Sequence, residues 1–465
     1  MAKRKAVSKY LTGIVVGAGE RGRDAYATYL LKHPEEGKII AVAEPKDARR
    51  AVFAKKYNIA PEYQFTDYNE VLSKPKFADF VIVATQDQMH VEPAVMAMEQ
   101  GYDVLLEKPM ALAEADCRYL VEVSERTGKL LQICHVLRYA PFFRTIKEIV
   151  DKGELGQIVT IQHSENVSHW HYAHSYCRGN WRNSATSSPM ILAKSCHDMD
   201  LLYWLAGTKP VKITSLARPT ELCEKNKPEG APLYCIEGCP HSSTCQYDAV
   251  PAYTRVEPML HDFELSQRHR GMKWLFHQAL HRPWVLYLIT FGFARKIWPW
   301  RGFPVTVITD DTSPAGIDKA LRTTTYGRCV YQVGDNDQVS SQTVNVQFEN
   351  GVNACFTMHS TSYREGREIR IDGTKGSIQG WFYQFDTYMR VVDHKTGKDR
   401  WIDIPMFFGA HGGGDQRLFA GFLAALRGDA KPLTTARESL TSHLMAFAAD
   451  QAQREGIVVD FATYL

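Results

Sequence analysis

The sequence predicts an α/β protein, with a parallel sheet in the first third of the chain and an antiparallel sheet in the remainder. Short β-rich runs alternate with helical stretches up to about residue 135, which is typical of βαβ units. From about residue 136, strand patterns alternate apolar with polar residues, as in an antiparallel sheet with one solvated face. A glycine motif stands between the first predicted strand and the first predicted helix, which favours a dinucleotide-binding domain at residues 1–135.

The elements of this first domain follow from hydrophobic patterning. We expect strands at residues 11–16, 38–43, 79–84, 103–106 and 130–134. The run at 79–84 is continuously apolar, as a strand buried on both faces should be. We expect helices at residues 21–32, 91–100 and about 112–127, and Gly101 is a suitable C-cap for the second of them.

Residues 136–465 are predicted to form a second domain that binds the substrate and carries the contacts between subunits. Its clearest strands are at 344–348, 354–359 and 369–372, and its clearest helices are at 416–426 and 436–454. Residues 217–313 lack clear periodicity and contain many Pro, Cys, His and Trp residues. Because plain loops of this length are uncommon, we interpret this segment as an insertion that forms a lid or a subunit contact.

Composition excludes several classes of protein. Of 465 residues, 45% are hydrophobic and 23% are charged, which is ordinary for a globular chain, and a net charge of +3 is too near neutral for a dedicated nucleic-acid binder. The richest apolar run, 283–300, is broken by Arg295 and Lys296, short of the ~18 apolar residues of a membrane span. The basic start, residues 1–9, runs into the glycine motif without a cleavage site. We therefore expect a cytoplasmic protein without nucleic-acid or membrane partners.

The glycine motif reads Gly17-Ala18-Gly19-Glu20-Arg21-Gly22, which is G-x-G-x-x-G. Its glycines allow a tight turn, close approach of the pyrophosphate and close helix–strand packing. Glu44, at the end of the second predicted strand, can accept hydrogen bonds from the ribose hydroxyls and would repel a 2′-phosphate. NAD is therefore expected rather than NADP, although the nearby Lys46, Arg49 and Arg50 weaken that preference. A glycine turn that only packs is the alternative interpretation.

Further motifs identify a family. Glu107-Lys108-Pro109 follows the fourth strand, A-T-Q-D-Q-M-H spans 84–90, R-Y-A-P spans 138–141, S-C-H-D-M-D spans 195–200 and H-G-G-G-D spans 411–415. Together with the glycine motif, these resemble the Gfo/Idh/MocA oxidoreductases, the relatives of glucose–fructose oxidoreductase and inositol dehydrogenase. The resemblance implies a Rossmann domain followed by an α/β domain whose large, open, mostly antiparallel sheet packs against a second subunit, in a homodimer or homotetramer.

The resemblance also implies an activity, which is hydride transfer between NAD and a secondary hydroxyl of a sugar, cyclitol or related polyol. It places the following side chains at the cofactor, in addition to the three glycines and Glu44: Glu20, Arg21, Thr85, Gln86, His90, Glu107 and Lys108. An ammonium at Lys108 can stabilise the developing alkoxide, or it can act as acid or base if desolvation lowers its pKa. A solvated lysine at a strand end is the alternative.

His197 matches the histidine of the family's G-x-x-x-D-x-x-x-H pattern, and an imidazole can accept a hydroxyl proton near neutral pH. The chain departs from that pattern at Ala193, where the family carries Asp, and Lys194 stands beside it. We expect a helix beginning near Pro189, so that Lys194 lies one turn from His197, contacts the substrate and lowers the pKa of His197 by like-charge repulsion. A structural histidine bonded to backbone is the alternative for His197.

The stretch 169–182 is the richest in aromatic and polar side chains, the combination that binds the apolar faces and polar edges of sugars. Together with Lys194 and His197, we expect the following residues to bind the substrate: Arg138, Trp170, His171, His174, Tyr176, Trp181 and Arg182. A zinc site is a rival interpretation, because His169 and His171 would share one face of a strand. No resident metal is expected.

Cys223, Cys235, Cys239 and Cys245 lie within 23 residues, but their spacing does not match paired C-x₂-C motifs. We expect reduced thiols, with a structural metal or a disulfide as alternatives.

Two other functions remain open. A redox-neutral glycoside hydrolase could use NAD to oxidise a glycoside transiently, eliminate the aglycone, rehydrate and reduce. A non-catalytic regulator could bind NAD or sugar, although Lys108 and His197 argue against it.

Overall fold

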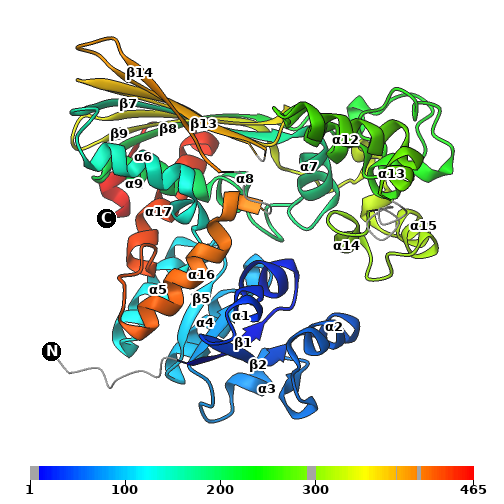
Figure 1. Cartoon of the computed structure of the whole chain (residues 1–465), viewed down its shortest axis with the longest axis horizontal. Coiled ribbons are helices and arrows are strands. Elements are labelled where there is room, and N and C mark those ends of the chain that lie inside the picture. The colour runs from blue at the N-terminus through cyan, green and yellow to red at the C-terminus, as the bar shows by residue number, and fades with distance from the viewer. Residues whose placement is uncertain (1–9, 291–299, 384, 406–409) are drawn as a thin grey trace.

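The computed structural model describes residues 10–383, except 291–299, and residues 385–465, except 406–409. The basic start of the chain, Arg295 and Lys296 therefore lie outside the described residues. Figure 1 shows a lower domain of parallel strands and helices, a broad sheet above it, and a group of helices beside that sheet. The predicted α/β class, with a parallel sheet followed by a large, mostly antiparallel sheet, is confirmed.

The N-terminal sheet has six parallel strands in the order β3-β2-β1-β4-β5-β6, the order of a dinucleotide-binding fold. Its strands are β1 (Leu11–Val16), β2 (Gly37–Ala43), β3 (Gln64–Phe65), β4 (Phe80–Val83), β5 (Asp103–Leu106) and β6 (Leu131–Ile133). β4 is buried at all four positions, as its continuous apolar run predicts. The two-residue strand β3 was not predicted, because so short a strand leaves no periodic signal.

Helices flank this sheet on both faces. They are η1 (Arg21–Tyr26), α1 (Thr28–Lys32), α2 (Asp47–Tyr57), α3 (Tyr68–Leu72), α4 (Val91–Glu99) and α5 (Glu114–Thr127). The single helix expected at 21–32 is divided at Ala27 into η1 and α1. Helix α16 (Gly414–Arg427) returns from the end of the chain, and Phe419 and Phe422 pack edge-on against Phe80 of β4. The C-terminal segment therefore completes the core of the N-terminal domain.

The second sheet has nine strands in the order β14-β13-β12-β11-β7-β10-β9-β8-β15. They are β7 (Ile158–Ser168), β8 (Pro210–Pro219), β9 (Val339–Phe348), β10 (Asn353–Ser362), β11 (Gly366–Gly373), β12 (Gly376–Tyr383), β13 (Asp386–Asp393), β14 (Asp399–Asp403) and β15 (Val459–Asp460). Only the β7–β10 pair is parallel among these described strands. The three strands predicted from alternation form parts of β9, β10 and β11.

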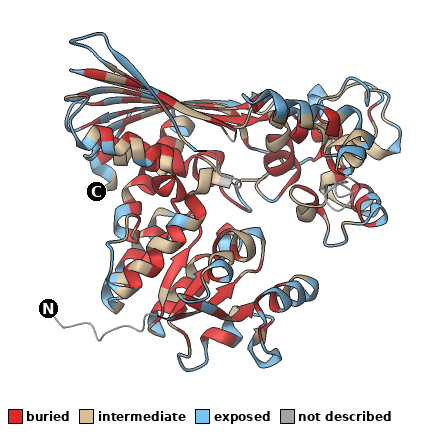
Figure 2. Cartoon of the chain, in the orientation of Figure 1, coloured by how far each residue is buried: buried red, intermediate tan, exposed pale blue. Residues whose placement is uncertain are grey.

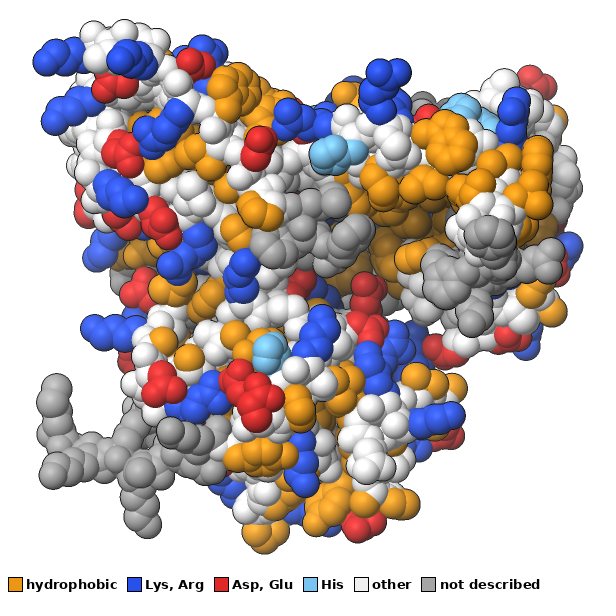
Figure 3. Space-filling view, in the orientation of Figure 1, with side chains coloured by type: hydrophobic (Ala, Val, Ile, Leu, Met, Phe, Trp, Pro, Cys, Tyr) orange, Lys and Arg blue, Asp and Glu red, His pale blue; other side chains and the backbone are white. Residues whose placement is uncertain are grey.

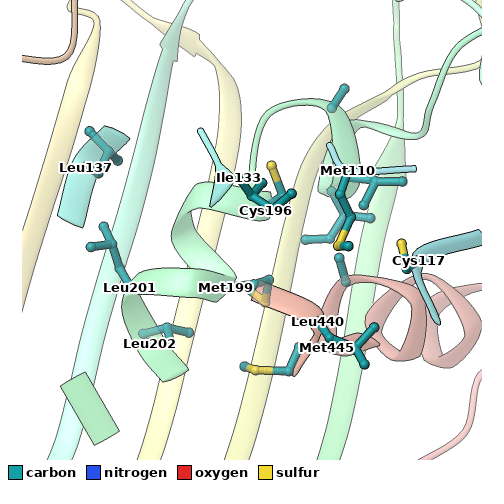
Figure 4. Close-up of a cluster of buried hydrophobic side chains, with 14 of the residues drawn as sticks. Met110, Cys117, Ile133, Leu137, Cys196, Met199, Leu201, Leu202, Leu440 and Met445 are labelled. Carbon is teal, nitrogen blue, oxygen red and sulfur yellow. The ribbon is translucent and has the colours of Figure 1, made fainter. Parts of the chain in front are cut away.

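Helices cover one face of this sheet (Figure 1): α6 (Pro141–Asp151), α9 (Cys196–Ala206) and α17 (Ala436–Glu455). Figure 4 shows their contribution to the core, where Met199 and Leu202 of α9 lie near Leu440 and Met445 of α17. Buried residues are concentrated between these helices and the sheet, and along strands such as β9 they alternate with less buried residues (Figure 2). On β12–β14, the rings of Trp381, Tyr388 and Trp401 stack on one another, and Trp401 is exposed.

The segment between β8 and β9, residues 220–338, contains the helices beside the sheet and is called the insertion below. Its helices are α10 (Ala249–Thr254), α11 (Glu257–Ser266), α12 (Arg270–His281), α13 (Pro283–Ile289), α14 (Val305–Ile308) and α15 (Pro314–Thr323). They enclose a small core of their own, which includes Tyr253, Leu260 and Leu321. The insertion thus extends beyond the expected 217–313, because α15 packs into that core. Among the described helices, none combines the length and apolarity needed to cross a bilayer.

Candidate active site

The three glycines of the loop after β1 differ in what surrounds them. A Cβ on Gly17 would lie 2.5 Å from the Ala84 carbonyl oxygen, and one on Gly22 would lie 2.2 Å from the Gly17 carbonyl oxygen. A Cβ on Gly19 would meet nothing within 4 Å. The fold itself therefore requires Gly17 and Gly22, whereas Gly19 leaves open space beside the backbone. That space fits a pyrophosphate approaching the loop.

Glu44 lies just past the end of β2 and faces this loop. Its carboxylate accepts hydrogen bonds from the backbone N–H groups of Ala18 (2.9 Å) and Lys46 (3.0 Å). Arg50 donates to the Glu44 carbonyl oxygen and pairs with Asp47, and Arg49 pairs at 3.0 Å with Asp310 of the insertion. Both arginines are thus engaged by acceptors of the protein, so neither is free for a 2′-phosphate.

Arg21 and Glu107 form an internal link rather than a surface for the cofactor. Arg21 donates to Glu107 at 2.6 Å and to Asp415 at 2.7 Å, and the Tyr26 hydroxyl also donates to Glu107. The Arg21 guanidinium lowers the pKa of the buried Glu107 carboxyl and holds that of Asp415 well below its usual range. Glu107 accepts the Lys108 N–H at 3.0 Å, so this link fixes the turn after β5.

The A-T-Q-D-Q-M-H segment follows β4 at the same edge of the sheet. His90 is buried, with Nδ1 at 2.7 Å from the Pro109 carbonyl oxygen and Nε2 at 3.3 Å from that of Thr85. His90 therefore ties this segment to the turn that carries Lys108, and both of its ring nitrogens are engaged. Gln86 is exposed at the edge, as is Glu20 beside the glycine loop. Asp87, which the sequence did not single out, accepts from Trp181 and Ser188 at 2.9 Å.

Lys108 reaches from the end of β5 to the second domain. Its Nζ donates to the Ala193 carbonyl oxygen at 2.8 Å. Ala193 occupies the position at which the sequence lacks the expected Asp. The backbone carbonyl at that position thus holds the ammonium, in place of a carboxylate.

His197 lies in the first turn of α9 and is 3% exposed. Within the described structure, neither of its ring nitrogens has a hydrogen-bond partner, which is unusual for a buried polar group. Burial lowers its pKa well below the usual range, and the nearby Lys108 ammonium, His411 and His135 lower it further. His197 is therefore a neutral imidazole with proton-accepting capacity, and it is not bonded to the backbone as the alternative interpretation required.

Lys194 differs from the expectation. The helix starting after Pro189 is only α8 (Met190–Ala193), and α9 starts at Cys196, so Lys194 lies in the break between two helices. Its Nζ pairs with Glu365 at 2.8 Å and Glu165 at 3.2 Å, and these carboxylates raise its pKa despite burial. Lys108, not Lys194, is the lysine that lowers the pKa of His197, so that part of the prediction is wrong.

The Lys194 ion pairs belong to a larger set, the buried charge network. It consists of His163, Glu165, His171, Lys194, Asp198, Glu365 and Arg367. Arg367 joins Glu165 at 2.6 Å to Asp198 at 2.7 Å, and together with His163 it keeps the pKa of Asp198 at about 2 despite burial. Sequence reasoning missed Glu165, Glu365 and Arg367, none of which lies on a strand that the sequence predicted, and Glu365 lies in the turn just before β11.

The aromatic stretch contributes four of the predicted residues to this region. His171 pairs with Glu365 at 2.9 Å, and the buried Tyr176 lies close enough to Lys194 for its charge to affect the pKa of the phenol. Trp170 donates to Asp262 of α11 at 3.4 Å, while Trp181 donates to Asp87. His169 and His171 lie in a helical turn, α7 (His169–Tyr172), and not on a strand face as the zinc interpretation assumed.

Three predicted substrate residues lie in other surroundings. Arg138 is buried, bonded to Asp200 by two hydrogen bonds of 2.7 Å and stacked over Trp204. Burial lowers the pKa of His174 to about 3, and this ring packs with Tyr253 and Tyr326 of the insertion. Arg182 pairs with Asp335. Each of these side chains binds protein groups and so holds structure together, and Arg138 reaches the surroundings of His197 through Asp200 and His135.

The cysteines are all free thiols. Cys235, Cys239 and Cys245 line one small cavity together with Cys329, which was not among the four predicted from spacing. Among the described residues, these thiols do not form one of the groups whose ligand atoms converge closely enough to hold a metal ion. The reduced state of these thiols stays a prediction.

Asp262 adds a titratable group from the insertion. It is 4% exposed and accepts the Glu365 N–H at 3.2 Å. Burial and the neighbouring Glu365 carboxylate raise its pKa to about 7. The insertion thus reaches the buried charge network through Asp262, and it reaches the cofactor edge through Asp310. Figure 3 shows a hollow lined by hydrophobic side chains where the insertion faces the rest of the molecule.

Comparison with protein families gives three matches along the chain. A model described as an oxidoreductase family with an NAD-binding Rossmann fold matches residues 12–135. Models of the C-terminal domain of the GFO/IDH/MocA proteins match residues 143–227 and 325–461. The segment between these two matches corresponds to most of the insertion.

Similar curated proteins include the putative oxidoreductase YteT of Bacillus subtilis, which is 32% identical over 37% of this chain and 40% of its own length. Inositol 2-dehydrogenase of Salmonella typhimurium is 28% identical over 43% of this chain and 56% of its own. The 2,7-anhydro-N-acetylneuraminate hydratase of Escherichia coli is 26% identical over 43% of this chain and 51% of its own length. The chain spans about half the length of the curated relatives it matches.

Solved structures share the fold along the whole chain. An oxidoreductase from Agrobacterium radiobacter, in complex with NAD+, L-tartaric acid and magnesium, has a TM-score of 0.64 at 14% identity and covers 98% of this chain and 99% of its own. The WlbA dehydrogenase from Bordetella pertussis, in complex with NADH and UDP-GlcNAcA, has a TM-score of 0.61 at 14% identity and covers 97% of each chain. Because both structures are only 14% identical in sequence to this chain, the similarity shows a shared fold.

Proposed function

Because the chain belongs to the GFO/IDH/MocA oxidoreductase family, whose N-terminal domain is an NAD-binding Rossmann fold, we propose that it is an NAD-dependent dehydrogenase of a sugar, cyclitol or related polyol. The observation that carries the proposal is the buried His197 imidazole, whose two ring nitrogens lack partners within the described structure, near the Lys108 ammonium. This pair of groups suits the removal of a proton from a hydroxyl group.

In the proposed reaction, His197 accepts the hydroxyl proton at a ring nitrogen. It can do so because burial and the Lys108 charge keep the ring neutral. The Lys108 ammonium, held by the Ala193 carbonyl oxygen, stabilises the developing alkoxide. A nicotinamide bound at the glycine loop would supply the acceptor for the hydride of the carbinol carbon. The sugar class is supported by His171, Tyr176 and the indoles of Trp170 and Trp181, and by the relatives named as inositol dehydrogenases.

A redox-neutral reaction is a second candidate, and one contact favours it. The Arg49–Asp310 pair joins α2 to the insertion at the cofactor edge, which suits a cofactor that is retained between turnovers. A relative named as a hydratase is consistent with a reaction of this kind.

One experiment separates the two. The protein is incubated with NAD and a panel of sugars, cyclitols and aryl glycosides, and NADH and free aglycone are followed in parallel. A dehydrogenase accumulates NADH, whereas a redox-neutral enzyme releases aglycone without it. If neither product forms while NAD binds, the proposal of catalysis fails and a regulatory role replaces it.

We also propose that the protein is a homodimer or homotetramer, because α6, α9 and α17 cover one face of the nine-stranded sheet and, among the described residues, no comparable layer covers the other (Figure 1). Light scattering should give a multiple of 52.7 kDa at micromolar concentration. A mass equal to that of one chain would contradict this.

A further inference from the structure

The insertion carries a group of side chains that the proposed reaction does not use. Glu264 on α11 and His277 and His281 on α12 each offer one ligand atom, and these atoms lie within 4.8 Å of one another. The two histidines are spaced i, i+4 on one helix, which places both rings on the same face. His277 Nδ1 is 3.0 Å from Glu264 Oε1, and the rings of His277 and His281 are 4.5 Å apart.

The helices that carry these residues are held together by apolar packing next to the group. Phe263 precedes Glu264, Phe276 precedes His277, and their rings are 5.6 Å apart. His261, one turn before Glu264, has its ring 6.2 Å from that of His281. The pattern is therefore His-x-x-Glu on one helix and His-x-x-x-His on the next, and the ligand atoms of Glu264, His277 and His281 converge at this helix–helix contact. His261 is not one of the converging residues, and its Nε2 is 4.0 Å from Glu257. His277 is about half exposed, so an ion can enter from solvent.

We propose that Glu264, His277 and His281 bind a divalent transition-metal ion of the zinc class, with water in the fourth position. Imidazole nitrogens and a carboxylate oxygen are the donors that Zn²⁺ takes, usually with tetrahedral geometry, whereas Mg²⁺ prefers oxygen donors and retains water. Binding replaces the His277–Glu264 hydrogen bond with two metal bonds. Figure 3 shows histidine side chains on the exposed surface of the insertion.

A second group with converging ligand atoms, formed by His33, Glu35 and Glu36, is a weaker candidate. Its Glu36 carboxylate already accepts a hydrogen bond from Tyr29 at 2.6 Å and pairs with Arg427 at 2.5 Å. In the part of the chain that the structure describes, Glu264 pairs with His277 and with no lysine or arginine.

The metal site would stabilise the part of the insertion that reaches the active site. Asp262 lies between His261 and Glu264 in the sequence, and its carboxylate accepts from Trp170 and from the Glu365 N–H on the inner side of α11. An ion on the outer side of α11 fixes this helix to α12. We therefore assign the ion a structural role in holding Asp262 against the buried charge network.

The test is a Zn²⁺ titration of the untagged full chain after removal of metals with EDTA. We expect wild type to bind Zn²⁺ in the presence of excess Mg²⁺, with an increase in Tm, since binding to the native state alone stabilises it. Because even indirect partners of a metal site are worth about 10- to 100-fold in affinity, His277→Ala and His281→Ala should each lose at least about 10-fold. His269→Ala, an exposed histidine at the start of α12, is the matched control and should bind as wild type does.

Hydrogen exchange gives the structural readout. Zn²⁺ should slow amide exchange in α11 and α12 of wild type and of His269→Ala, but not of the double variant His277→Ala, His281→Ala. Retention of wild-type Zn²⁺ affinity by that double variant would overturn the proposal, because the thiols or other histidines would then hold the ion. Failure of wild type to bind Zn²⁺ would overturn it equally, and neither result bears on NAD binding.

Discussion

The glycine loop between β1 and η1 and the buried charge network both belong to the candidate active site, but they are built differently. The loop comes from six consecutive residues, and its geometry depends on backbone contacts such as that between Gly22 and the Gly17 carbonyl oxygen. The charge network draws its members from β7, α7, α9, β11 and the segments beside them. A local motif therefore predicts the cofactor half of the site, whereas only the tertiary fold brings the catalytic half together.

The largest expected effect concerns the two groups that face the proposed reaction. Lys108→Ala and His197→Ala should each lower kcat about 10²–10⁴-fold, because each removes one positioned proton-transfer or charge-stabilising group. NAD affinity should change little for His197→Ala, whereas the Tm should fall, because loss of this buried ring leaves a cavity beside His135 and His411. Steady-state kinetics with a substrate from the panel and NAD titrations measure both effects. Near-wild-type turnover by His197→Ala would place the base elsewhere in the site.

The kcat of Lys194→Ala should lie between that of these two variants and that of wild type. Lys194→Ala leaves Glu165 and Glu365 facing each other without their shared cation, which should cost stability as well as turnover. We expect about a 10- to 100-fold loss of kcat and an unchanged NAD affinity, because Lys194 acts through the charge network and not through the glycine loop. Lys194→Arg, which keeps the charge, should recover part of the activity. If Lys194→Ala weakened NAD binding as much as turnover, the separation of the two halves would be wrong.

A matched pair of glycine variants tests the cofactor half. Gly22→Ala brings a Cβ against the Gly17 carbonyl oxygen and should lower the free energy of unfolding by about 1–3 kcal/mol. Gly19→Ala meets no protein atom within 4 Å, so it should keep the Tm of wild type and lose NAD affinity by about 10-fold or more. Thermal unfolding and NAD titration of both variants give the comparison. A Gly19→Ala protein that binds NAD normally would show that the pyrophosphate does not approach this loop.

A smaller effect is expected from pH on the free energy of unfolding, through the buried rings of His135 and His443. Burial lowers the pKa of His135 to about 4 and that of His443 to about 3, and their rings lie 5.3 Å apart. His443 Nε2 accepts the Met110 N–H while Nδ1 donates to the Ser439 carbonyl oxygen, so a second proton would break the first bond.

Unfolded histidine has a pKa of about 6.5, so below this pH the unfolded chain binds more protons than the folded one. The stability that these neutral rings contribute is present above pH 6.5 and is lost as the pH falls toward about 4. Each histidine can contribute a slope of up to about 1.4 kcal/mol per pH unit. Denaturant unfolding at pH 7 and pH 5 should show the loss, and His443→Gln should reduce it. A free energy of unfolding that does not change over this range would contradict the account.

The glycine loop and the buried charge network also differ in how far they could be predicted from the sequence. The strands β1, β2, β4 and β5 and the glycine loop between β1 and the first helix were predictable, because strand burial and turn geometry leave local patterns. The roles of Glu44 and Lys108 stay predictions. Glu165 and Arg367 were not predicted, because their pairing depends on the register between β7 and β11. Glu365 was not predicted either, because it lies in the turn before β11 and meets Lys194 and His171 only in the folded chain. The predicted placement of Lys194 one helical turn from His197 was wrong, because the chain breaks between α8 and α9 and the predicted helix continued across that break. Its contact with the substrate stays a prediction. His174 and Arg138 resembled site residues in sequence, but their partners lie in the insertion and on α9.

The most direct measurement follows the hydrogen that the proposed reaction transfers. A substrate from the panel, deuterated at the carbinol carbon, is mixed with the enzyme and NAD under single-turnover conditions, and the quenched cofactor is analysed by mass spectrometry. The account predicts one deuterium in the reduced nicotinamide with wild type, formed about 10²–10⁴-fold more slowly with His197→Ala. Product formation with no deuterium in the cofactor, or equal rates for wild type and His197→Ala, would contradict it.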